Sequence, residues 1–154
     1  MTKKLIAYFS ASGVTKRVAE NLNTVIDSDI FEIEPKEKYT SADLNWNDKN
    51  SRSSIEMNDK SSRPEIKNKI DVSNYDTIII GFPVWWYTAP TIINTFIEEN
   101  NLKGKRIYVF VTSGSTNYQE SLEDLRKTYP DLNFVSGKKY RAREPEEEYI
   151  NWIK

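Results

Sequence analysis

One apolar segment near the middle of the chain restricts the fold more than any other feature. Residues 76–82 contain the run from Thr77 to Gly81, which is strongly β-branched and apolar at successive positions. Because successive side chains of a strand point to opposite faces, a strand of this composition is buried on both faces. The pattern is typical of a central strand in a parallel sheet that helices cover on both sides.

The rest of the chain alternates between strand and helix patterns, which predicts an α/β fold with a parallel sheet between two helical layers. Further strands are expected at residues 3–9, 29–34, 106–112 and 132–135. Helices are expected at residues 14–26, from Pro90 onward, at 118–129 and at 145–154. The length of 154 residues fits one domain, residues 1–154, with a sizeable core.

Residues 36–64 interrupt this rhythm and are dense in Ser, Asn, Asp and Lys. A bare loop of this length is uncommon inside a compact domain. We expect a mostly irregular surface segment, with a possible helical turn at residues 41–44 and a short piece of crossover helix at residues 65–70. This segment, residues 36–64, is called the polar excursion below.

The composition excludes several chemistries, because the chain has neither cysteine nor histidine. Disulfides, thiol nucleophiles, Ser-His-Asp triads and zinc sites built on His or Cys are ruled out, and no catalytic side chain or metal ligand is predicted. The net charge of −1 gives no indication of nucleic-acid binding. No apolar stretch is long enough for membrane insertion, and the N-terminus has no signal-peptide pattern, so a cytoplasmic location is expected.

The turn after the first strand is rich in hydroxyls and leads directly into a helix. Ser10, Ser12 and Thr15 surround Gly13 and Val14 in this turn. Backbone N–H groups and the positive end of a helix dipole meet at such a turn, which suits a phosphate. It lacks the lysine of a triphosphate loop and the three glycines of a dinucleotide loop, so one terminal monophosphate is favoured. An ordinary helix cap with a serine is the alternative.

Two more loops at the same edge of the sheet are unusual. The loop from Pro83 to Pro90 contains three consecutive aromatic residues, which cannot all point into the core. The loop from Thr112 to Tyr118 consists mainly of small and hydroxylated residues, which let a ligand approach the backbone. Ligands of open α/β sheets bind beyond the carboxyl ends of the strands. The three loops together indicate one cofactor with a phosphate at one end and a flat ring at the other.

With these three loops, the chain resembles the flavodoxin-like family over essentially its whole length, and in particular the short-chain flavodoxins that bind FMN. The resemblance implies a five-stranded parallel sheet in the order 2-1-3-4-5. It also implies that Ser10, Ser12, Gly13, Val14 and Thr15 hold the FMN phosphate. The positions Pro83, Val84, Trp85, Trp86 and Tyr87 would line the ribityl chain and one side of the ring. Thr112, Ser113, Gly114 and Ser115 would reach the pyrimidine edge through backbone N–H groups, with Tyr118 as a further ring contact.

The resemblance departs from the family pattern in two respects and leaves three functions open. The chain is nearly neutral, whereas electron-carrier flavodoxins are usually strongly acidic. The loop from Pro83 to Pro90 also lacks the glycine that many members place beside the flavin N5. The first function is electron transfer to redox partner proteins. The second is an NAD(P)H-dependent oxidoreductase that reduces a quinone or a similar small-molecule acceptor. The third is a binding module for another phosphate ligand.

Overall fold

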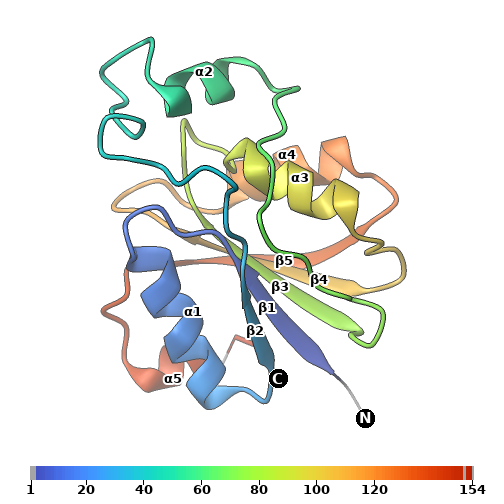
Figure 1. Cartoon of the computed structure of the whole chain (residues 1–154). Coiled ribbons are helices and arrows are strands. Elements are labelled where there is room, and N and C mark those ends of the chain that lie inside the picture. The colour runs from blue at the N-terminus through green and yellow to red at the C-terminus, as the bar shows by residue number, and fades with distance from the viewer. Residues whose placement is uncertain (1–2, 151, 154) are drawn as a thin grey trace.

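The computed structural model describes residues 3–150, 152 and 153, and its centre is a parallel sheet of five strands (Figure 1). The strands are β1 (Lys4–Tyr8), β2 (Asp29–Glu32), β3 (Thr77–Pro83), β4 (Arg106–Thr112) and β5 (Asn133–Tyr140). Their order is β2-β1-β3-β4-β5, which confirms the expected 2-1-3-4-5 topology. The strand order reverses between β1 and β3, so the carboxyl ends of these two strands flank the switch point where a ligand site is expected.

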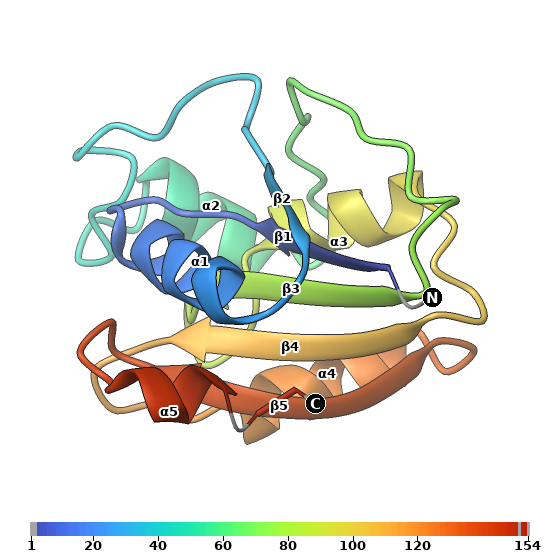
Figure 2. The same ribbon diagram turned by 90° about the horizontal axis from the view of Figure 1, so that it is seen from below.

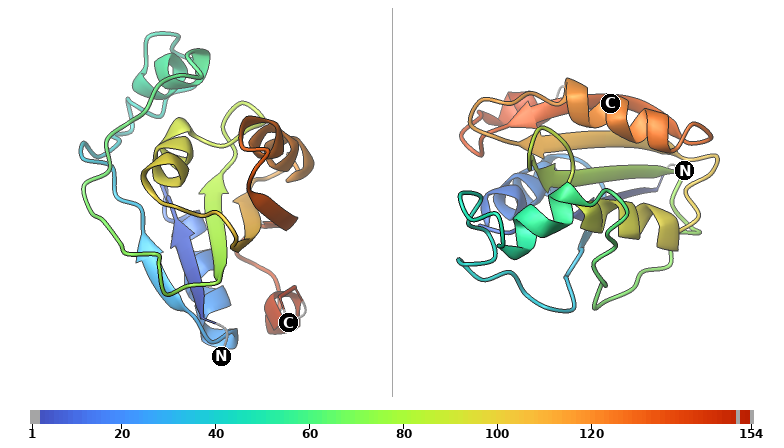
Figure 3. Two further views of the ribbon diagram at one scale, coloured as in Figure 1. Left: turned by 90° about the vertical axis from the view of Figure 1, so that its right-hand side faces the viewer. Right: turned by 90° about the horizontal axis from the view of Figure 1, so that it is seen from above.

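Helices cover both faces of the sheet, as the buried strands require. They are α1 (Val14–Val25), α2 (Arg52–Asn58), α3 (Thr91–Glu99), α4 (Gln119–Thr128) and α5 (Glu146–Ile150). Figure 2 shows α1 and α5 on one side of the sheet and α3 and α4 on the other. In Figure 3, left, α2 lies beyond the ends toward which the strands point. In the described part of the chain, no helix has the length and apolar character needed to cross a membrane.

The core explains why the central strands were predictable. β1, β3 and β4 have almost every residue buried, so both faces are apolar. Gly81 interrupts the bulky run because the ring of Phe110 on the neighbouring strand lies over it. A Cβ at Gly81 would come within 2.0 Å of the Cζ atom of Phe110. This glycine therefore permits close packing between two strands.

The fifth strand is longer than predicted. It was expected at residues 132–135, but it runs from Asn133 to Tyr140 and pairs with the whole of β4. Its second half, which contains Gly137 and two lysines, has little intrinsic strand preference. Pairing with β4 overrides that preference, and the register places Tyr140 opposite Thr112.

The polar excursion contains a helix that the sequence did not predict. α2 occupies residues 52–58, and Ser51 caps it by accepting a hydrogen bond from the N–H group of Ser54. Residues 41–44 form turns, but the short helix expected at 65–70 is absent. There, Pro35 and Ile66 form an isolated antiparallel bridge that brings the two ends of the excursion together.

The last predicted helix is also shorter than expected. It was predicted over residues 145–154, whereas α5 covers Glu146–Ile150. Residues 151 and 154 lie outside the described residues, so that part of the prediction is not tested. From the sequence, Trp152 is expected to be a packing residue, which agrees with its edge-to-face contacts with Tyr108 and Tyr140.

Candidate functional site

Thr112 is the point at which the three unusual loops converge. It ends β4, where the sheet register places it opposite Pro83 on one side and Tyr140 on the other. Its hydroxyl also lies 2.7 Å from the hydroxyl of Thr15 at the start of α1, and both side chains are buried. The loops after β1, β3 and β4 are therefore held at one place at the carboxyl edge of the sheet.

The hydroxyls of the first loop, Ser10 to Thr15, serve different purposes. The Oγ atom of Ser10 accepts hydrogen bonds from the N–H groups of Gly13 and Lys16, so this side chain supports the loop itself. The hydroxyl of Thr15 is bonded to Thr112, below the surface. Ser12, Gly13 and Val14 are exposed, and Gly13 has the left-handed backbone angle φ 94° that glycine readily adopts. Thus Ser12 is the hydroxyl that faces outward, rather than all three.

The aromatic loop ends in a strained turn. Trp85 and Thr88 exchange two backbone hydrogen bonds, of 2.9 and 3.1 Å, around the pair Trp86 and Tyr87. Both residues of this pair have positive φ angles, 48° and 71°. Asn and Gly are the usual residues in a two-residue turn of this shape, because bulky side chains are unfavourable there. The turn therefore holds two large rings at the surface, with exposed fractions of 43% for Trp86 and 63% for Tyr87.

Trp85 points the other way and anchors the turn. Its ring makes edge-to-face contacts with Phe9 and Tyr39, with ring centroids 5.7 and 5.4 Å apart. Burial raises the pKa of the Tyr39 hydroxyl well above its usual value, and its hydrogen bond to the Glu56 carboxylate acts in the same direction. From the sequence, one of the three aromatic residues is expected to pack under the helix that follows the loop. Trp85 is the one that packs inward, and its ring contacts are with Phe9 and Tyr39.

The third loop folds back on its own serine. The Oγ atom of Ser113 accepts hydrogen bonds from the N–H groups of Ser115 and Thr116. Gly114 is exposed, and a Cβ at this position would meet no atom within 4 Å. Its carbonyl accepts a hydrogen bond of 2.8 Å from the guanidinium of Arg141. The loop is therefore fixed by side chains while its tip stays open to a ligand.

A cleft of about 720 Å³ lies between these loops and the polar excursion. This volume is within the range of ligand sites for small molecules. We call it the aromatic cleft, and its lining residues are Ala11, Ser12, Leu44, Trp46, Ser53, Pro83, Val84, Trp85, Trp86, Tyr87, Ser115 and Thr116. From the sequence, Trp46 is expected to be a packing residue rather than a ligand contact. That expectation was wrong, since this side chain is 72% exposed and lines the cleft.

A smaller cavity of about 270 Å³ adjoins the aromatic cleft and shares Ser12 and Pro83 with it. Its lining residues are Ser12, Val14, Pro83, Thr112, Ser113, Gly114, Arg141 and Arg143. We call it the arginine cavity. Sequence reasoning missed both arginines as site residues, because they follow β5 and reach the site only through the pairing of β5 with β4.

Tyr118 lies apart from the aromatic cleft. Its ring packs against β5, where a Cβ at Gly137 would come within 2.5 Å of the Cδ2 atom of the ring. With Gly137 it lines a different cavity, beside Leu122 and Arg126. Contact with a ring in the aromatic cleft would require another side-chain orientation of Tyr118.

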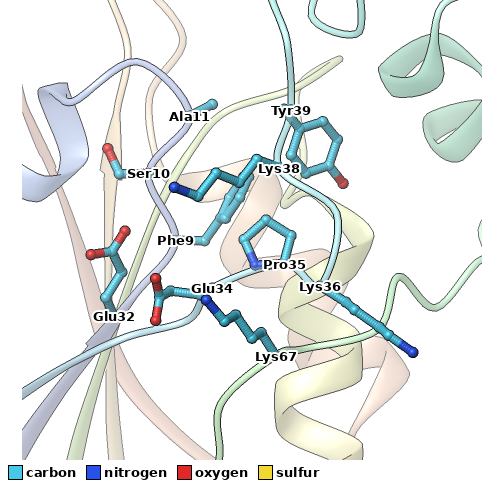
Figure 4. Close-up of a pocket in the computed structure, with 10 residues that line it drawn as sticks. All are labelled: Phe9, Ser10, Ala11, Glu32, Glu34, Pro35, Lys36, Lys38, Tyr39 and Lys67. Atoms are coloured by element: carbon cyan, nitrogen blue, oxygen red, sulfur yellow. The ribbon is translucent and has the colours of Figure 1, made fainter.

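A third cavity, of about 290 Å³, lies at the outer side of the first loop (Figure 4). Two carboxylates, from Glu32 and Glu34, and three lysines line it together with Ser10. Lys36 points away from the others in Figure 4 and forms an ion pair of 3.1 Å with Glu65. The carboxylate of Glu32 accepts a hydrogen bond from Tyr8, and burial and then this charge raise the pKa of the Tyr8 hydroxyl. Because Lys36 is paired elsewhere, two lysines face two carboxylates, so this cavity has no excess positive charge to attract a phosphate.

The residues of the other two cavities fit FMN. The aromatic cleft offers flat, exposed rings to a planar group, and the adjoining arginine cavity offers hydroxyls and two cations to a phosphate. At Gly13 in the first loop and at Gly114 in the third, a Cβ would stand in open space, so a ligand can approach the backbone of both loops.

The comparison with known families decides the identity of the fold. A family model described as Flavodoxin matches residues 3–154. The chain belongs to the flavodoxin family. No curated protein sequence matches it.

Solved structures of the flavodoxin family include close relatives. A protein described as a flavoprotein from Bacteroides eggerthii is 49% identical, with a TM-score of 0.95, covering 99% of this chain and 96% of that one. A similar protein from Bacteroides uniformis is 45% identical, with a TM-score of 0.94 and coverage of 99% and 97%. A flavoprotein from Lactobacillus acidophilus, solved in complex with FMN, is 32% identical, with a TM-score of 0.75 and coverage of 90% and 93%.

Proposed function

We propose that this protein binds FMN at the carboxyl edge of its sheet and acts as a flavodoxin in electron transfer. The observation that supports this most is the strained turn at Trp86 and Tyr87, which holds two aromatic rings in solvent beside a hydroxyl-rich loop. Strain of this kind is retained where surrounding structure and function require it. The FMN bound by the relative from Lactobacillus acidophilus is consistent with the proposal.

Bound FMN would supply the redox chemistry, and the protein would bind and orient it. Trp86 and Tyr87 would cover the ring and exclude water from part of it, because both are exposed rings in the wall of the aromatic cleft. Ser12 and the exposed backbone of Gly13 and Val14 would face the phosphate. The third loop, closed by Ser113, would present its backbone to the polar edge of the ring.

A second function, reduction of a quinone or a similar acceptor with NAD(P)H, is favoured by two observations. The net charge of −1 gives little electrostatic attraction for a basic partner protein. Trp46 leaves 72% of its side chain exposed at the wall of the aromatic cleft, where it could contact a flat acceptor. A hydride carried by the flavin requires no histidine.

The experiment that tests binding is a titration of the apoprotein with FMN, followed by flavin fluorescence and by the visible spectrum. We expect saturable quenching at one FMN per chain, and a protein that FMN cannot saturate would refute the proposal. The second measurement separates the two roles of the holoprotein. Rapid NADPH oxidation that depends on added quinone would identify the oxidoreductase, whereas two separate one-electron steps during anaerobic photoreduction without NADPH turnover would support electron transfer.

A further inference from the structure

The segment after β5 brings two arginines to the loop that ends β4. The sheet register pairs Tyr140 with Thr112, so the next residue, Arg141, lies beside the third loop. Its guanidinium donates a hydrogen bond of 2.8 Å to the carbonyl of Gly114. Arg143 lines the same cavity two residues later.

The backbone between the two arginines is held in an unfavourable conformation. Ala142 has a φ angle of 68°, in the left-handed region that a residue with a Cβ rarely occupies. The carboxylate of Glu144 accepts hydrogen bonds from the backbone N–H groups of Arg141 and Arg143, at 2.7 and 3.2 Å. The Glu144 side chain therefore stabilises the turn by binding the backbone of the two arginines. Among the described residues, neither arginine guanidinium forms an ion pair with a carboxylate.

The cavity that these arginines enter also contains the start of α1. Ser12 and Val14 line it, together with Thr112 and Ser113. The first N–H groups of a helix have no partner within the helix. In α1 the N–H group of Lys16 is bonded to Ser10, so among the described residues the N–H groups of Val14 and Thr15 are the donors that remain at this position. Among the described residues, no acidic side chain lines this cavity. The cavity on the other side of the first loop contains Glu32 and Glu34 beside three lysines, one of which is paired with Glu65. The electrostatics therefore favour a dianion on the side of Arg141 and Arg143.

We propose that Arg141 and Arg143 bind the phosphate group of FMN from the side opposite to the first loop. The proposal rests on FMN binding as the function of the chain. A phosphate monoester carries nearly two negative charges at neutral pH, and guanidinium groups form strong, charge-assisted hydrogen bonds with it. Affinity for FMN over riboflavin, which has no phosphate, then depends on the segment after β5 as well as on the loop at Ser10 to Thr15.

The test measures dissociation constants of the apoprotein for FMN and for riboflavin. The substitution Arg143→Gln removes one guanidinium that has no hydrogen bond to the protein among the described residues, so we expect the fold to be retained. We expect FMN affinity to fall about five- to tenfold, because an exposed ion pair is weak but the phosphate carries nearly two charges. Riboflavin affinity should change by less than about twofold, because riboflavin has no phosphate. The control Lys127→Gln removes the same charge from an exposed position on α4 and should leave both constants unchanged.

Two further measurements make the result specific. Arg143→Lys keeps the charge and should recover part of the FMN affinity. The advantage of the unmodified protein over Arg143→Gln should also shrink as salt rises from about 50 to 300 mM, because salt screens exposed charges. Equal losses for FMN and riboflavin, or no loss for either, would overturn the proposal. A parent protein that does not bind FMN would instead refute the proposed function itself.

Discussion

The strained turn at Trp86 and Tyr87 leads to a prediction about stability as well as about binding. Replacing the pair by Asn and Gly puts into the turn the residues that adopt its left-handed conformation most readily. Each bulky residue in that conformation costs roughly 1–2 kcal/mol. The hydrogen bond that Ser121 donates to the backbone carbonyl of Tyr87 is unaffected by the substitution.

The size of the effect follows from what the two side chains contact. Trp86 and Tyr87 leave 43% and 63% of their surface exposed, and the packing of the covered part is lost in both variants compared here, so it cancels. Glycine adds flexibility to the unfolded chain, which offsets part of the gain by about 0.5–1 kcal/mol. The net expectation is a gain of about 1–2 kcal/mol for the apoprotein relative to the pair Ala-Ala, which lacks the rings but keeps the strain. At a typical slope of about 2 kcal/mol per M urea, the midpoint differs by roughly 0.5–1 M.

The assay is urea unfolding of the apoprotein, followed by far-UV circular dichroism, together with FMN titration. Both variants should lose FMN affinity to a similar extent, because both lack the rings. Only the Asn-Gly variant should unfold at higher urea than the Ala-Ala variant. If the two unfold at the same concentration, the turn stores no strain and the reasoning is wrong.

Three other outcomes are expected. Thr15→Val and Thr112→Val should each destabilise the apoprotein by about 1–3 kcal/mol in urea unfolding, because each leaves a buried hydroxyl without its partner. The double variant should lose clearly less stability than the sum of the two, and strict additivity would contradict this contact. Gly81→Ala should lower stability by about 1–3 kcal/mol or more, because its Cβ would lie 2.0 Å from the ring of Phe110, and an unchanged urea midpoint would exclude that clash. Burial, and then a neighbouring carboxylate, raise the pKa of Tyr129 to about 12, above its ordinary value near 10. The folded state holds this proton more tightly than the unfolded state, so the contribution of Tyr129 to stability is full below pH 10 and is lost as the pH rises toward 12. In thermal melts across this range, the melting temperature should fall less steeply with pH for Tyr129→Phe than for the unmodified protein.

The parts of the fold that could be predicted are those in which burial alone determines the pattern. The strand from Thr77 to Pro83 is apolar at nearly every position because helices cover both of its faces. The switch-point loops were recognisable because hydroxyls and adjacent aromatic residues are unusual directly after such strands. These features depend on local sequence and on one general rule of α/β sheets.

The parts that could not be predicted depend on tertiary contacts. α2 buries Ser53, Ser54 and Met57 rather than an apolar stripe, so it has no helical hydrophobic signal. The second half of β5 is a strand because β4 offers it hydrogen bonds. For the same reason Arg141 and Arg143 were not recognised as site residues. Trp46 was expected to be a packing residue, and only the three-dimensional path of the excursion brings it to the aromatic cleft.

The bridge between Pro35 and Ile66 also concerns how this fold can diversify. It brings both ends of the polar excursion together, so the distance between the points where the excursion leaves and rejoins the rest of the domain does not depend on its length. The entropic cost of closing a loop grows only slowly with the number of residues. Insertions, deletions and substitutions between these two points can therefore reshape the outer wall of the aromatic cleft at little cost to the core. Selection can therefore alter which molecules enter the aromatic cleft while the loops at the carboxyl edge of the sheet stay the same.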